Sequence, residues 1–176
     1  MRLFLYMYME LNKNEYAPFF ETYISLSRIL SLPKDLMFNM ENTIAFFKSI
    51  PKDKLNYRYQ PEKWSIKDIL LHLIDCERIF QYRALRISRK DTTPLPGFEE
   101  DDYAIEANAT NRSLDDLLIE YKSVRLATYS LFESFDKEKF NLMGNASGKD
   151  ISVRAIGFII LGHELHHIKI IKERYL

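Results

Sequence analysis

The sequence contains very little cysteine, and this scarcity limits both its covalent structure and its compartment. Cys76 is the one cysteine among 176 residues. An intramolecular disulfide therefore cannot form, and nothing else in the sequence indicates an oxidising environment. Glycine and proline are also scarce, with 5 and 6 residues, which argues against disorder and favours a compact helical fold. We expect a cytoplasmic protein.

The chain also lacks an excess of either charge and any long apolar run. Lys and Arg number 25, as do Asp and Glu, so no net field attracts nucleic acid or an anionic membrane. The opening apolar stretch ends at Glu10 and is too short to span a bilayer. We expect no nucleic-acid partner and no membrane partner. Residues 1–8 are interpreted as an upstream extension with Met9 as an alternative start, and residues 9–176 as a single domain.

Apolar residues recur at helical spacing along almost the whole chain, which predicts an all-α fold. Ser65 and Asp68 are arranged like a capping box and mark the clearest helix start. The pattern predicts a short leading helix over about 15–28 and four long helices over about 34–49, 65–89, 113–135 and 152–175, the last capped by Asp150 or Ser152. The expected architecture is a four-helix bundle.

Two connections interrupt this helical pattern. The first contains two prolines, a glycine and the acidic run 99–102, and its length is typical of a lid or a crossover rather than a tight turn. The second contains Gly144, Asn145 and Gly148 and leads to the last helix. The long first connection allows the helix that follows it to lie across the bundle.

The histidines carry the strongest functional signal. Only four are present, and three of them lie within residues 163–167. His163 and His167 lie about 40° apart on one helix face, in the apolar stripe, where two imidazoles are costly to bury without a partner. His72 lies near the edge of the buried face of an earlier helix and supplies a third imidazole. Three imidazoles with an open position are typical of a catalytic metal site, whereas a pair of hydrogen-bonded core histidines is the alternative.

The residues around these histidines are weaker candidates. Residues 163–167 match the HExxH pattern of zinc proteases, but only nine residues follow His167, so the usual downstream third ligand is missing. Glu164 is a candidate proton acceptor or a solvent-facing charge. Asp75 is a candidate to orient His72 or to accept a proton, the alternative being a surface ion pair with Arg78 or Arg83. His166 and Cys76 are left outside the site.

Several segments, in this order, resemble the DinB-like superfamily and, within it, the YfiT-like metal-dependent proteins. They are Lys63–Lys67, His72–Arg78, Tyr82–Ala84, Pro96–Phe98, Gly162–His167 and Glu173–Tyr175. The resemblance covers the chain from about Glu15 to its end. It implies a four-helix bundle with a long crossover, commonly a homodimer, that holds one divalent metal on three histidines. By motif position these are His72, His163 and His167.

The resemblance leaves the metal and the reaction open. Related proteins are associated with zinc, nickel, iron or manganese, and some transfer a low-molecular-weight thiol such as bacillithiol or mycothiol. Our first hypothesis is a thiol transferase acting on small electrophilic substrates. The alternatives are a metal-dependent hydrolase, in which Glu164 or Asp75 moves the proton of a metal-activated water, and a non-catalytic metal-binding stress-response protein.

Overall fold

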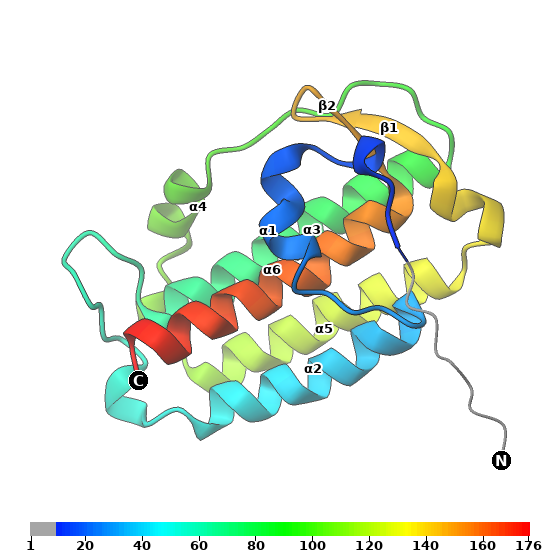
Figure 1. Cartoon of the computed structure of the whole chain (residues 1–176). Helices are drawn as coiled ribbons and strands as arrows, with labels where there is room; N and C mark the ends of the chain where they lie inside the picture. Colours follow the sequence, from blue (N-terminus) through cyan, green and yellow to red (C-terminus); the bar gives the residue numbers. More distant parts are fainter. Residues whose placement is uncertain (1–9) are drawn as a thin grey trace, which may run out of the picture.

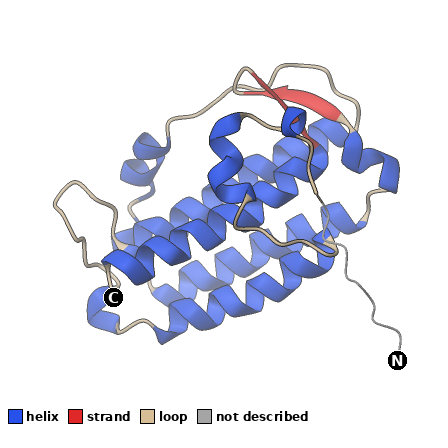
Figure 2. Ribbon diagram, in the orientation of Figure 1, coloured by secondary structure: helices blue, strands red, loops and turns tan. Residues whose placement is uncertain are grey.

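The computed structural model describes residues 10–176, so the proposed extension 1–8 lies outside the described residues. The fold is mostly helical (Figures 1 and 2). Four long helices form the bundle: α2 (Leu32–Ser49), α3 (Ile66–Ser88), α5 (Leu114–Glu133) and α6 (Val153–Arg174). The shorter elements are α1 (Glu21–Ile24), α4 (Glu100–Ala107), β1 (Met143–Ala146), β2 (Lys149–Ser152) and the 3-10 turns Lys13–Glu15, Pro18–Phe20, Lys52–Lys54, Ala109–Asn111 and Lys137–Asn141.

The predicted all-α four-helix bundle is confirmed, and its helices have an uncommon order. The principal contacts of α3 are with α5 and α6, and those of α2 are also with α5 and α6. Consecutive helices α2 and α3 therefore occupy diagonal corners of the bundle. Figure 1 shows α3 and α6 on one side and α2 and α5 on the other. The long connection between α3 and α5, which carries α4, is the crossover that this order requires.

Local signals place the helix starts that matter for the site. Ser65 accepts a hydrogen bond from the backbone N–H of Asp68, and the Asp68 carboxylate accepts one from the Ser65 N–H at 2.8 Å, so the predicted capping box begins α3. Ser152, not Asp150, caps α6. Helix α2 begins two residues earlier than predicted, because Pro33 is tolerated in the first turn of a helix.

The single leading helix predicted over 15–28 is wrong in extent. Tyr16 and Ala17 are extended, and two 3-10 turns precede the four-residue α1. Pro18 explains the break, because the residue before a proline is disfavoured in the helical region. The segment folds over α6, against which α1 packs (Figure 1).

The connection before α6 forms a small antiparallel hairpin that the sequence pattern did not predict. Ala146 pairs with Lys149 across the turn, and the turn residues Ser147 and Gly148 have φ of 54° and 73°. Positive φ at both positions matches the twist of a two-residue hairpin. Leu95 of the crossover donates to Asn145 and accepts from Ser147, each at 2.9 Å. The hairpin thus anchors the crossover to the end of the bundle.

Two apolar clusters fill the bundle, one at each end. One gathers residues of α2, α3 and α6 with the leading segment and the hairpin, and the other gathers residues of α2, α3 and α5 with the end of α6. Within residues 10–176, no helix is long and apolar enough to cross a membrane.

We predict that Gly162→Ala destabilises the protein by about 1–3 kcal/mol, although alanine favours helix more than glycine does. A Cβ at Gly162 would lie 2.0 Å from the carbonyl oxygen of Tyr23, so α1 has to move away from α6. Urea unfolding measures the effect, and Ser123→Ala on the exposed face of α5 is the control. Equal stability of the two variants would contradict the close packing of α1 on α6.

Candidate metal centre

Three histidines from two helices meet where α3 packs against α6. His72 projects from α3, and His163 and His167 project from successive turns of α6. The Nε2 atom of His163 lies 3.0 Å from Nε2 of His72 and 3.0 Å from Nε2 of His167. One ligand atom from each ring falls within 4.8 Å of the others. We call these residues the histidine cluster; His166 is not part of it.

Burial keeps the three imidazoles neutral. Desolvation lowers the pKa of His72 to about 4 and that of His167 to about 3, the latter with a contribution from neighbouring histidines. The pKa of His163, which is 5 % exposed, lies well below its ordinary value for the same reasons. Neutral imidazole is the form that binds metal.

The residues of the cluster fit a divalent metal ion. A neutral imidazole carries one ring proton, so Nε2 of His163 cannot donate to both of its close neighbours. Nitrogen ligands about 2.0–2.1 Å from a tetrahedral ion lie about 3.3 Å apart, close to the separations seen between these Nε2 atoms. Nδ1 of His167 is buried without a hydrogen-bond partner among the described residues. One ion facing the Nε2 atoms would accept the lone pairs of these converging nitrogens, whereas Nδ1 of His167 lies on the other side of its ring.

Aromatic side chains cover the cluster. The Trp64 ring lies 4.5 Å from the His72 ring, and the Tyr23 ring lies 5.1 Å from the His163 ring, each measured between centroids. Trp64 immediately precedes the Ser65 cap of α3, and Tyr23 belongs to α1. The cap and the short helix therefore position the covering side chains. This cover explains the desolvation of the imidazoles.

A cavity of about 330 Å³ adjoins His167. Its size is at the lower end of small-molecule sites. It is lined by polar and aromatic side chains, among them Tyr59, Glu62, Trp64, Asp101, His166 and Tyr175. The helix α4 contributes Asp101, so the acidic run of the crossover lies beside the site rather than in an unstructured loop. The predicted lid or crossover is thus a short helix next to the cluster.

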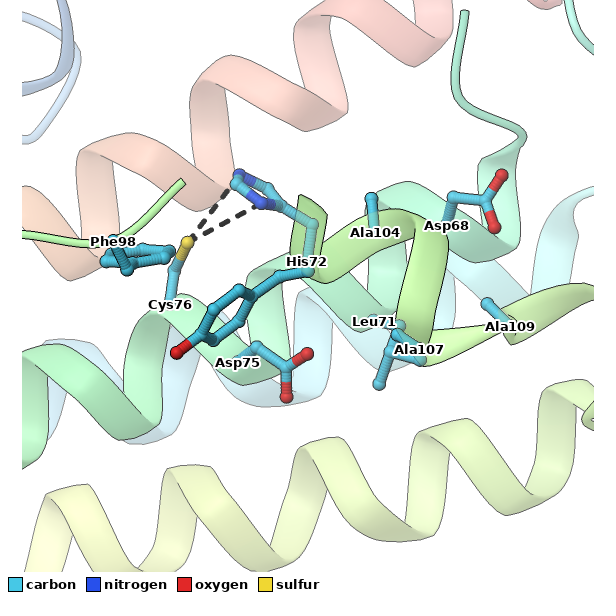
Figure 3. Close-up of a pocket in the computed structure, with 10 residues that line it drawn as sticks. Asp68, Leu71, His72, Asp75, Cys76, Phe98, Ala104, Ala107 and Ala109 are labelled. Atoms are coloured by element: carbon cyan, nitrogen blue, oxygen red, sulfur yellow. Dashed lines mark hydrogen bonds between the residues drawn. The ribbon is translucent and has the colours of Figure 1, made fainter. Parts of the chain in front are cut away.

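Asp75 and Cys76 lie beside His72 on α3 (Figure 3). The Cys76 sulfur is 3.5 Å from Nδ1 of His72, and burial raises the pKa of the thiol well above its ordinary value. Cys76 is therefore a protonated thiol next to the outer nitrogen of His72. The Asp75 carboxylate accepts from Arg78 at 3.3 Å, which is the surface ion pair considered as the alternative to a catalytic role, and points away from the imidazole in Figure 3.

Glu164 is neither solvent-facing nor free. It is 1 % exposed, and its Oε2 accepts from Arg125 at 2.7 Å and from the Tyr121 hydroxyl. Arg125 also donates to both oxygens of Glu77 at 2.8–3.0 Å. We call Glu77, Tyr121, Arg125 and Glu164 the core ion network. Oε1 of Glu164 is buried and accepts no hydrogen bond among the described residues, although the Thr43 hydroxyl of α2 lies near the carboxylate.

The core ion network was missed by the sequence reasoning, although a signal was present. Arg125 lies one turn after Tyr121 in the apolar stripe of α5, and Glu77 lies one turn after Leu73 in that of α3. Opposite charges at core positions of two helices predict a buried pair, because a single buried charge is too costly. Trp64 lies within the segment Lys63–Lys67 that resembles the superfamily, but its contact with His72 was not predicted.

Comparisons with known proteins identify the family and the fold of the chain. The sequence profile of the DinB superfamily matches residues 36–171. The structure is similar to that of YfiT from Bacillus subtilis, described as "a probable metal-dependent hydrolase with an unusual four-helix bundle topology", with a TM-score of 0.69 and 12 % identity over 94 % of this chain and 91 % of that one. At this identity the likeness shows the fold alone. A search of curated proteins found no significant match.

We predict that the metal-free protein loses stability as the pH falls from about 6.5 to about 4.5. In this window the unfolded chain protonates its histidines, whereas the folded cluster stays neutral, so the unfolded state binds more protons and gains stability. The loss is about 2 kcal/mol for His72 alone. Urea unfolding of chelated protein across this window measures it.

The matched variant for this prediction is His72→Gln, which removes one titrating imidazole. Its stability is expected to depend less steeply on pH than that of the wild-type protein. Identical slopes for the two proteins would contradict a neutral, desolvated His72. Glu15 does not interfere, because its pKa is lowered to about 2 and its contribution is lost only below about pH 4.5.

Proposed function

Because the chain belongs to the DinB superfamily, we propose that it is a metal-dependent enzyme whose divalent ion is held by His72, His163 and His167. The observation that carries the proposal is the approach of their Nε2 atoms to 3.0 Å across two helices. The same imidazoles suit zinc, nickel, iron or manganese. A divalent ion held there supplies a Lewis acid that lowers the pKa of a coordinated water or thiol.

We propose transfer of a low-molecular-weight thiol to a small electrophilic substrate as the first candidate reaction. The support is the state of the two nearby carboxylates. Glu164 is held by Arg125 and Tyr121, and Asp75 is paired with Arg78. A coordinated thiol is more acidic than a coordinated water, so it loses its proton more completely at neutral pH and depends less on a nearby protein base. The cavity beside His167 offers room for a small organic thiol.

The alternative reaction is hydrolysis by a metal-activated water. It is supported by the similarity of the fold to YfiT, described as a metal-dependent hydrolase. Of the two predicted proton acceptors, Asp75 suits this role better, because it lines a small cavity with His72 and its ion pair with Arg78 is partly exposed. Burial raises the pKa of Asp75, which favours proton uptake. We propose that Glu164 has a structural role instead.

A non-catalytic metal-binding stress-response protein is the third candidate. It differs from the other two in what the metal does, because a purely structural ion contributes its binding energy to folding. The apolar clusters on both sides of the histidine cluster favour a bundle that persists without the ion. A small-molecule substrate, a homodimer and a cytoplasmic location stay predictions.

We predict that His163→Ala removes stoichiometric metal, because His163 is the imidazole that contacts both of the others. Elemental analysis of protein purified without added metal measures the content. The control His166→Ala is expected to keep the wild-type content. Retained metal in His163→Ala would contradict the site. Chelation of the wild-type protein is expected to leave its helical circular dichroism intact, whereas unfolding would support a structural ion.

We predict thiol-dependent, chelator-sensitive consumption of an electrophile such as monochlorobimane. In this reaction Asp75→Asn is expected to retain activity within about twofold, because no protein base is needed. If water is the nucleophile instead, the same variant loses about 100-fold or more in ester or amide hydrolysis. A fluorescence assay with several cellular thiols separates the two reactions, and failure with every thiol would count against the first.

A further inference from the structure

The core ion network and the histidine cluster meet at a small cavity between α3, α5 and α6. The cavity measures about 10 Å³, which is room for one water molecule. It is lined by three charged residues and His163 together with apolar side chains: Leu73, Glu77, Phe80, Arg125, Ile160, His163 and Glu164. Among the cavities described, only this one is lined by side chains of both the core ion network and the histidine cluster.

One buried polar atom at this cavity, Oε1 of Glu164, lacks a hydrogen-bond partner among residues 10–176. The Glu164 side chain is 1 % exposed. Because Nε2 of His163 faces the other two imidazoles, Nδ1 is its outer nitrogen, and no described hydrogen bond reaches it. A buried carboxylate oxygen without a partner is costly. The outer nitrogen of a metal-binding histidine ordinarily donates to a carboxylate, a carbonyl or a water.

We propose that one ordered water occupies this cavity and links Nδ1–H of His163 to Oε1 of Glu164. The water accepts from His163 and donates to Glu164, and the Glu77 carboxylate is within the same lining as a third partner. Three hydrogen bonds are typical of a buried water. Arg125 and Tyr121 hold Oε2 of Glu164, which leaves Oε1 for the water.

This link makes Glu164 a positioning residue of the metal centre. The water orients the His163 ring and keeps its proton on Nδ1, so that Nε2 carries the lone pair directed at the other two imidazoles. The ring that approaches both other histidines is then oriented by charges from α3 and α5. The inference rests on the proposed metal-binding function, but the water itself does not require a bound ion.

The main test is the metal affinity of Glu164→Gln, measured by competition with a chelator of known affinity. We expect a loss of about 10–100-fold, the usual effect of removing a group that orients a metal-binding histidine. The control is Glu15→Gln. Glu15 lies on the leading segment, and its buried carboxylate also has an arginine partner, Arg154 of α6. This control is expected to keep wild-type affinity. Equal affinity of Glu164→Gln and the control would overturn the proposal.

A second variant keeps every charge and is designed to displace the water. Leu73→Phe adds roughly the volume of one water beside the cavity. We expect it to weaken metal binding to a similar extent as Glu164→Gln, and it decides the question if Glu164→Gln does not fold. Unchanged affinity in folded Leu73→Phe would overturn the proposal.

Nuclear magnetic resonance of the metal-free protein separates this inference from the proposed function. We expect a proton on Nδ1 of His163 that exchanges slowly and shows a cross-relaxation peak to a bound water. If the wild-type protein binds no metal but shows this signal, the proposed metal binding is contradicted while the proposed water is supported. A His163 ring protonated on Nε2 alone would overturn the proposed water link. A Nδ1 proton without contact to water would overturn it as well.

Discussion

The packing of α6 against α3 is the contact on which the site depends. It brings His72 against His163 and His167, with His72 and His163 buried and His167 partly buried. Desolvation there disfavours the charged form of each imidazole, so three rings coexist as neutral groups instead of repelling one another as cations. The same desolvation leaves ring nitrogens with too few protein partners. The helix contact therefore brings the three imidazole nitrogens together and also leaves them short of protein partners, which a metal ion would replace.

The core ion network joins α5 to both helices of this contact, α3 and α6. Arg125 is 1 % exposed and lies between two carboxylates, one on each helix of the α3–α6 pair. Taking these charges out of water costs free energy, which the geometry offsets with several charge-assisted hydrogen bonds. Since hydrogen bonds are directional, the network restricts how α5 can slide or rotate against α3 and α6. Glu164 serves this network, although its neighbour in the chain belongs to the histidine cluster.

The surrounding elements control access more than they build the centre. Trp64, Tyr23 and the short helix α4 come from segments outside the four long helices, and they border the cluster and its adjoining cavity. The hairpin before α6 holds the crossover that carries α4. A bundle of this kind can keep its ligands while the covering segments change.

The sequence by itself determined the helical class, the capping box at Ser65 and the common face of His163 and His167, because these depend on spacing within one helix. Periodicity also indicated His72 as a third imidazole on an earlier helix, and the resemblance placed the same three residues at its motif positions. Tertiary structure decided the rest: the partners of Glu164, the ion pair of Asp75 and the aromatic cover of the cluster. Spacing gives the direction of a side chain around its own helix axis. Which group it meets depends on the diagonal order of the helices and on side chains far away in the chain.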